Sequence, residues 1–211
     1  GGEKLAAQYG VDLLASLPLS MAIRMQADGG KPTAASGLQV NAFAEDLDHP
    51  RWLHVLPNGD VLVAESNAPK TDKPFSLKGW ITSKVMKRAG AKPPSADRIT
   101  LLRDANNDGT PEIRTVFIDN LNAPYGLAFV DGAVYVANQD ALMRFPYQEG
   151  QTEITAPGEE VAKLPSAINH HWTKSLAASA DGSKLYVGIG SNSNVGERGM
   201  DVEEERAVVW E

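Results

Sequence analysis

The first 36 residues alternate between short helical and short extended patterns. Glu3–Tyr9 predicts a helix that ends at Gly10, and Val11–Leu14 predicts a short buried strand. Leu19–Gln26 then predicts a second helix. The chain is therefore expected to begin with a short α-β-α segment.

The pattern of hydrophobic and polar positions changes at residues 33–37, a linker of small residues. Beyond it the period is two, which is typical of strands that bury one face. We therefore expect a domain boundary near residue 36, with an all-β domain over 37–211.

Three segments of the all-β domain repeat one pattern of strand, Asn-Gly or Asp-Gly turn, and strand: 47–64, 121–137 and 171–188. Further strands are predicted between them, at Arg98–Arg103, Arg114–Ile118 and Ala141–Pro146. Four strands in a repeat of roughly 40–50 residues are typical of a β-propeller blade. The sequence thus predicts about three blades.

The first repeat is lengthened by an insertion at residues 68–96, with a short helix predicted at Trp80–Ala89. The insertion is basic, and its cationic residues are Lys70, Lys73, Lys78, Lys84, Lys87, Arg88 and Lys92. A basic amphipathic helix can contact an acidic partner or anionic lipid. A solvated loop without a partner is the alternative.

Composition narrows the classes of function. Hydrophobic residues make up 42% of the chain and charged residues 22%, as in soluble globular domains. The net charge of −7 is spread along the sequence, so nucleic acid is not an expected partner. There is no cysteine, which excludes disulfides and thiolate sites, and no apolar run approaches the roughly 20 residues of a membrane span.

One motif indicates a metal site from its residues alone. Oxygen-bearing side chains alternate through a loop that turns at Gly109: Asp104, Asn106, Asp108, Thr110 and Glu112. A hard cation such as calcium needs this kind of wrapping. Thr115 stands where an EF-hand has its bidentate Glu, so a full EF-hand is excluded. The loop predicts a structural calcium ion, with a solvated Asp-Gly turn as the alternative.

Most of the chain after residue 37 resembles the sorbosone and glucose dehydrogenases that use pyrroloquinoline quinone. The resemblance is carried by DHPRW at 48–52, LPNGDVLVAE at 56–65, RITLLRD at 98–104, INHHWTKSL at 168–176 and GSNSNVGE at 190–197. It implies a six-bladed propeller with the quinone at the mouth of a central channel, usually assisted by calcium. It also implies a histidine base that takes the proton of a sugar hydroxyl while hydride passes to the quinone.

His171 is the candidate base, because it stands five residues before Leu176 in the family's H-x-x-x-x-L pattern. His170 is then expected to point away. A neutral imidazole suits this task, since its ordinary pKa lies near 6.5. The alternative is that the histidine pair only caps a strand or satisfies loop backbone.

The resemblance also suggests contacts to the quinone. Ser191, Asn192 and Asn194 follow a strand and could donate to its carbonyls or carboxylates, although small polar residues are also ordinary turn formers. Arg51 could bind a carboxylate in bidentate fashion, or lie exposed with a structural role.

The first segment resembles the C-terminal tail of the Mrp-type P-loop ATPases that carry iron–sulfur clusters. There is no Walker A loop, because Gly30-Lys31 is followed by Pro32 where the motif needs Ser or Thr. The cysteine pair that binds the cluster in that family is also missing. That family is cytosolic, whereas the quinoprotein propellers work in the periplasm, which is the location we expect for the propeller.

The resemblance implies a dehydrogenase that oxidises a sugar or sugar aldehyde and passes electrons to a quinone or a cytochrome. With about three of six blades, the chain alone is expected to be weakly active or inactive, with further arginines and calcium ligands lying beyond Glu211. A calcium-dependent propeller lactonase, with Glu65 as a metal ligand, is one alternative. A non-catalytic binding propeller is another.

Overall fold

A computed structural model describes residues 7–9, 38–69, 84 and 95–211. The chain divides into two compact units, Gly1–Ala42 and Phe43–Glu211. In the first unit residues 7–9 are helical. The strand predicted at Val11–Leu14 and the helices predicted at Leu19–Gln26 and Trp80–Ala89 lie outside the described residues, apart from Lys84.

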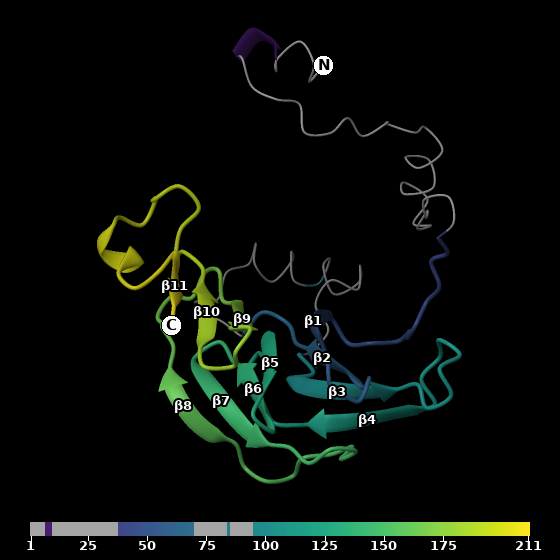
Figure 1. The fold of residues 1–211 in the computed structure, drawn as a ribbon. Coiled ribbons are helices and arrows are strands. Elements are labelled where there is room, and N and C mark those ends of the chain that lie inside the picture. The colour runs from purple at the N-terminus through teal and green to yellow at the C-terminus, as the bar shows by residue number, and fades with distance from the viewer. Residues whose placement is uncertain (1–6, 10–37, 70–83, 85–94) are drawn as a thin grey trace. The chain divides into compact units, whose positions relative to one another are not determined.

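The described part of the second unit forms three antiparallel sheets in chain order (Figure 1). The first sheet consists of β1 (Pro50–Val55), β2 (Val61–Glu65), β3 (Arg98–Arg103) and β4 (Ile113–Ile118). The second consists of β5 (Gly126–Val130), β6 (Ala133–Ala137), β7 (Ala141–Pro146) and β8 (Glu159–Lys163). The third consists of β9 (Lys174–Ala178), β10 (Leu185–Ile189) and β11 (Val208–Trp210), with the 3-10 helix η1 (Asp201–Glu203) between its last two strands. The prediction of an all-β partial propeller of about three blades is confirmed.

The predicted Asp-Gly turn of the second sheet joins β5 to β6. Asp131 and Gly132 both have positive φ, 47° and 70°, as a tight hairpin turn requires. The register that follows pairs Val130 with Ala133 and Ala128 with Tyr135. A two-residue turn of this kind fixes which face of each strand is buried.

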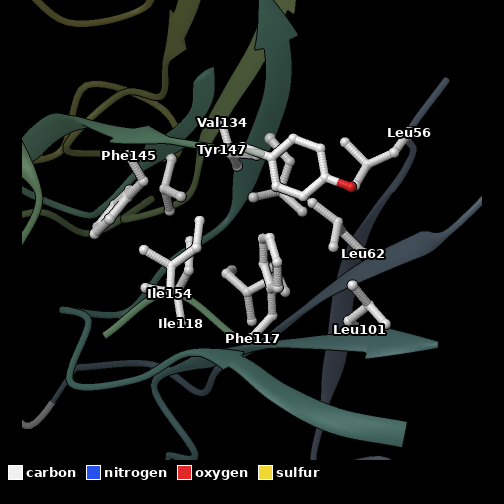
Figure 2. Packing of buried hydrophobic residues seen from close by; sticks show 13 residues of the cluster. Leu56, Leu62, Leu101, Phe117, Ile118, Val134, Phe145, Tyr147 and Ile154 are labelled. Atoms are coloured by element: carbon white, nitrogen blue, oxygen red, sulfur yellow. The ribbon is translucent and has the colours of Figure 1, made fainter. Parts of the chain in front are cut away.

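The larger hydrophobic core lies between the first and second sheets. Figure 2 shows Leu62, Leu101 and Phe117 of the first sheet facing Val134 and Phe145 of the second. Phe117 is fully buried, and its ring centroid lies 5.9 Å from that of Tyr147. A smaller cluster, with Ala137 and Leu142 on one side and Leu176, Val187 and Ile189 on the other, joins the second sheet to the third. Each sheet therefore packs face to face on the next, as propeller blades do.

The first strands of successive sheets lie side by side, β1 against β5 and β5 against β9. The contact between β5 and β9 requires Gly126. A Cβ built there would lie 2.5 Å from the backbone nitrogen of Leu176. Glycine is the one residue that permits this approach of two backbones.

Strand direction sorts the loops into two sets. Loops that lead into the first strand of a sheet, or leave its second strand, lie at one end of the blades, which we call the entry end. Contacts between sheets confirm this, since Ser66 after β2 donates to Pro124 O before β5 at 2.5 Å. Loops 104–112 and 147–158 lie at the opposite, far end, where Arg103 reaches Gly150 O at 3.1 Å. None of the described helices is long and apolar enough to cross a membrane.

Candidate active site

His171 lies in the entry-end loop before β9, with its side chain exposed. Its Nδ1 is 2.8 Å from the backbone oxygen of Ser191 and 3.1 Å from Ser191 Oγ. Because a carbonyl oxygen only accepts, Nδ1 carries the proton of the neutral ring, and Nε2 is left as an acceptor. His170 is also exposed, and its ring stands at 83° to that of His171 with the centroids 4.8 Å apart. The assignment of His171 as the base, with His170 pointing away, stays a prediction.

Three aromatic rings gather at the entry end, from Trp52 in β1, Tyr125 just before β5 and Trp172 in the loop before β9. The centroid of Tyr125 lies 5.4 Å from that of Trp52 and 6.3 Å from that of Trp172. Arg51 Cζ lies 5.7 Å from the ring centroid of Trp172, and Arg51 Nε donates to Ser66 O at 2.8 Å. The fold thus brings Arg51 next to the residue that follows His171, although 120 positions separate them in the sequence.

A cavity of about 560 Å³ adjoins these rings. Its walls include Trp52 and Tyr125, the polar side chains of Thr173 and Ser175, and the backbone around Gly190. A cavity with aromatic walls and a few polar groups is typical of a small-molecule site.

The residues after β10 that are predicted to contact the cofactor make hydrogen bonds to other groups of the protein. Asn192 is 3% exposed, and its Nδ2 donates to Val202 O at 2.8 Å while its Oδ1 accepts from His170 N at 3.4 Å. Glu203 binds Asn192 N and the Ser193 hydroxyl, which ties η1 to this loop. Asn194 is exposed, and its backbone N–H donates to Glu197. Quinone contact by Ser191, Asn192 and Asn194 stays a prediction, and Asn192 would have to exchange its present bonds.

Two buried cations behind the His171 loop were not predicted. Lys174 is fully buried, and Arg206 is 4% exposed. Burial, and then the charge of Arg206, lowers the pKa of Lys174 to about 8. Burial likewise lowers the pKa of Arg206. One feature of the sequence is consistent with the burial of Lys174. Lys174 and Leu176 are two positions apart, and such positions lie on the same face of a strand, here the buried face of β9.

The predicted calcium loop lies at the far end, away from His171. Carboxylate oxygens of Asp104, Asp108 and Glu112 lie within 4.8 Å of one another. Asp104 accepts from Gly109 N at 2.8 Å and Glu112 from Ala105 N at 2.8 Å, so the loop is also held by its own backbone. Thr110 N donates to Asp108, and Asn106 Nδ2 lies 3.1 Å from Asp108 Oδ2. Calcium binding here stays a prediction, and the position suits a structural ion.

Glu65, the carboxylate that the lactonase alternative needs, is fully buried at the end of β2. It accepts from Arg98 Nε at 3.1 Å, from the Thr100 hydroxyl and from the backbone N–H of Asp48. Burial raises the pKa of Glu65, but the bonds from Arg98 and Thr100 outweigh it and hold the pKa below its ordinary value. The carboxylate is therefore ionised and engaged with the protein.

Solved structures share this fold. The iodide structure of a Carbohydrate-Active Enzymes Family AA12 protein from Trichoderma reesei matches 84% of the chain with a TM-score of 0.60 and 17% identity. The holo form of the pyranose dehydrogenase PQQ domain from Coprinopsis cinerea also matches 84%, with a TM-score of 0.57 and 16% identity. The calcium structure of the Trichoderma reesei protein matches 80%, with a TM-score of 0.57 and 17% identity. The chain covers 39%, 36% and 36% of these proteins, and identities this low show the fold alone.

The N-terminal segment is similar in sequence to a different protein. Over 34 residues the chain is 79% identical to the iron–sulfur cluster carrier protein of Pseudomonas fragi, which supports the resemblance of that segment to a cluster carrier. The match covers 16% of this chain and 12% of that protein.

Residues 36–206, which include every strand of the three sheets except β11, match the family described as a domain of unknown function, DUF7133. The match starts at the predicted domain boundary and extends through His171 and Arg206. The chain therefore belongs to the DUF7133 family.

Proposed function

We propose that this chain is part of an oxidoreductase that uses pyrroloquinoline quinone to oxidise a sugar or sugar aldehyde, with His171 as the general base. The observation that carries the proposal is the contact between His171 Nδ1 and the Ser191 carbonyl at 2.8 Å. It leaves Nε2 of a solvent-exposed imidazole as a proton acceptor. His171 adjoins Gly190, which lines the cavity that Trp52 and Tyr125 also line. The likeness to the pyranose dehydrogenase PQQ domain and to the AA12 protein supports this choice of chemistry.

The residues at the entry end fit the quinone. It is a flat aromatic molecule with three carboxylates, and the site offers the rings of Trp52, Tyr125 and Trp172 for stacking. Arg51 already lies over Trp172, and its Nη2 donates to Asn67 Oδ1 at 3.4 Å, a bond that it could exchange for a carboxylate of the quinone. When bound, the quinone supplies the acceptor for the hydride that leaves the substrate carbon.

Residues of this chain accept the proton of the substrate hydroxyl. The hydroxyl of the alcohol, or of the hydrated aldehyde, donates its proton to His171 Nε2 as the carbonyl of the product forms. The Ser191 carbonyl holds Nδ1–H and so stabilises the imidazolium that results. Arg206 donates to Gly190 O at 2.7 Å and to His171 O at 3.3 Å, which fixes both loops that set this contact.

Calcium is proposed in two places, beside the quinone, as the family resemblance implies, and in the far-end loop. The calcium structure of the Trichoderma reesei AA12 protein supports a cation in this fold, and the far-end loop around Asp108 offers a structural site. We further propose that the electrons pass on to a quinone or a cytochrome and that the propeller works in the periplasm, as the family resemblance implies.

Titration of the purified chain with the quinone, followed by the cofactor's absorbance with and without calcium, tests the proposal. Saturable binding is expected. Absence of binding at millimolar quinone with calcium present would refute cofactor function for this chain.

The histidine pair supplies a matched test of the base. In the whole oxidoreductase of which this chain is proposed to be a part, with quinone and sugar present, His171→Asn is expected to lower dye reduction by roughly 100-fold or more, while quinone binding is retained. His170→Asn is the control, because it changes the neighbouring ring and leaves the Ser191 contact intact. Equal activity of the two variants would remove His171 from the mechanism.

A further inference from the structure

One amide oxygen behind the His171 loop receives hydrogen bonds from two buried cations. Asn169 Oδ1 accepts from Lys174 Nζ at 2.9 Å and from both terminal nitrogens of Arg206 at 3.2 Å. An amide oxygen satisfies these donors but carries no charge. The Lys174–Arg206 pair is therefore hydrogen-bonded without being neutralised.

No carboxylate bonds either cation in the part of the chain that the structure describes. The acids that act on them from a distance are Asp140 on Lys174 and Glu203 on Arg206. Asp140 accepts from Asn122 Nδ2 at 2.7 Å, and Glu203 binds the loop after β10. Buried charges without a counter-ion are costly, so an uncompensated pair calls for a reason.

Aspartate would remove this cost for the loss of one hydrogen bond, the one that Asn169 Nδ2 donates to Gln139 Oε1 at 3.1 Å. Asn169 has a φ of 48°, a left-handed conformation that Asn and Asp both tolerate. An Asp at this position would place a carboxylate oxygen where three cationic N–H groups already converge. The neutral amide thus leaves both cations without a directly bonded carboxylate, although the fold could readily supply one.

The charge lies directly behind the candidate active site. Arg206 donates to the backbone oxygen of His171 at 3.3 Å, and Lys174 donates to that of Trp172 at 3.2 Å. Arg51 lies on the ring of Trp172, so three cations surround the residues that follow the base. An anion bound at the entry end would therefore feel the pair through a single layer of backbone.

We infer that Asn169 keeps the Lys174–Arg206 pair uncompensated so that an anionic ligand at the entry end serves as its counter-ion. This inference rests on the proposed function, in which that ligand is the tricarboxylate quinone. The pair acts through the loop rather than by contact, so its members are positioning residues that favour a charged cofactor over a neutral one.

The test compares the wild-type chain with Asn169→Asp, using pyrroloquinoline quinone and its uncharged trimethyl ester as probes. One added unit of charge at roughly 10 Å from a single carboxylate of the quinone, under an effective dielectric constant near 20, predicts an increase of at least about tenfold in the Kd of the quinone. The Kd of the ester should stay unchanged. The Tm of the variant should rise, because the new carboxylate neutralises the pair.

Each other outcome overturns the inference. Equal quinone affinities would show that the pair is not felt at the site, and the proposed function would stand. An equal loss for quinone and ester would show a change of shape instead of charge. If the wild-type chain binds no quinone, the proposed function fails and the inference fails with it. Lys174→Met, which removes a cation but keeps the apolar stem, should also weaken only the quinone, and it decides the matter if Asn169→Asp does not fold.

Discussion

Gly126→Ala should destabilise the protein through a backbone clash between the second and third sheets. The added Cβ would lie 2.5 Å from Leu176 N and 2.6 Å from Lys174 O, so β5 and β9 must separate by about 0.9 Å to reach the shortest ordinary contact, 3.4 Å. Both atoms belong to the backbone, and no change of rotamer relieves them. Overpacking of this kind costs about 1–3 kcal/mol, or a fall in Tm of roughly 2–12 °C for a chain of this size.

Thermal unfolding of the full chain, followed by circular dichroism, measures the effect, and Gly188→Ala is the matched control. Gly188 also lies in a strand, and the atom nearest to its built Cβ is Ser175 Oγ at 2.3 Å. A hydroxyl moves by rotation about one bond, so this control should cost less than about 1 kcal/mol. If both variants lose the same stability, or Gly126→Ala loses none, the packing of β5 on β9 is not set by glycine.

Two further predictions concern charged groups at the far end. Arg103 and Asn58 hold the pKa of Asp60 below its ordinary value although burial raises it, so the stabilisation is present above the unfolded pKa of about 4 and is lost as pH falls through the folded pKa. Urea unfolding should therefore show Asp60→Asn much less stable than the wild type at pH 7, with the difference shrinking as the pH falls below about 4. A difference independent of pH would contradict this reasoning. If the far-end loop binds calcium, a 100-fold excess over Kd should stabilise the chain by about 2.7 kcal/mol, and Glu112→Gln, which keeps an acceptor for Ala105 N, should abolish most of this gain in a thermal shift assay. No calcium-dependent rise in the wild-type Tm would leave the loop as a simple turn.

The strands that the sequence predicts are those marked by hydrophobic alternation and by turn residues beside them. Arg98–Arg103 and Ala141–Pro146 are confirmed to the residue, and Arg114–Ile118 is one residue short of β4. The strand β8, by contrast, was not predicted, because all five of its residues are exposed and no hydrophobic alternation marks it. Its pairing with β7 comes from a sheet edge that only the tertiary structure supplies.

Tertiary contact likewise decides the candidate active site. The motif around His171 identifies a base by resemblance, but the Ser191 carbonyl that assigns its proton lies 20 residues away on the next loop. Arg206 follows three glutamates, where an arginine is ordinarily exposed, yet it is buried by Asn169 and the carbonyls around it. Burial of a charged group cannot be deduced from its neighbours in sequence, because it depends on which donors and acceptors the fold brings together.

The electrostatic energy of the entry end depends on whether its buried cations are paired with carboxylates. A chain selected only for stability would place an acid beside Lys174 and Arg206, since a buried cation gains most from a paired carboxylate. The first sheet does this twice, with Glu65 on Arg98 and Asp60 on Arg103. The third sheet instead offers Asn169, in a loop that also carries His171. The first sheet thus pairs its partly exposed arginines with buried carboxylates, whereas the third sheet leaves two buried cations without a bonded carboxylate. This pair lies behind the proposed base, where an anionic ligand can supply the missing charge.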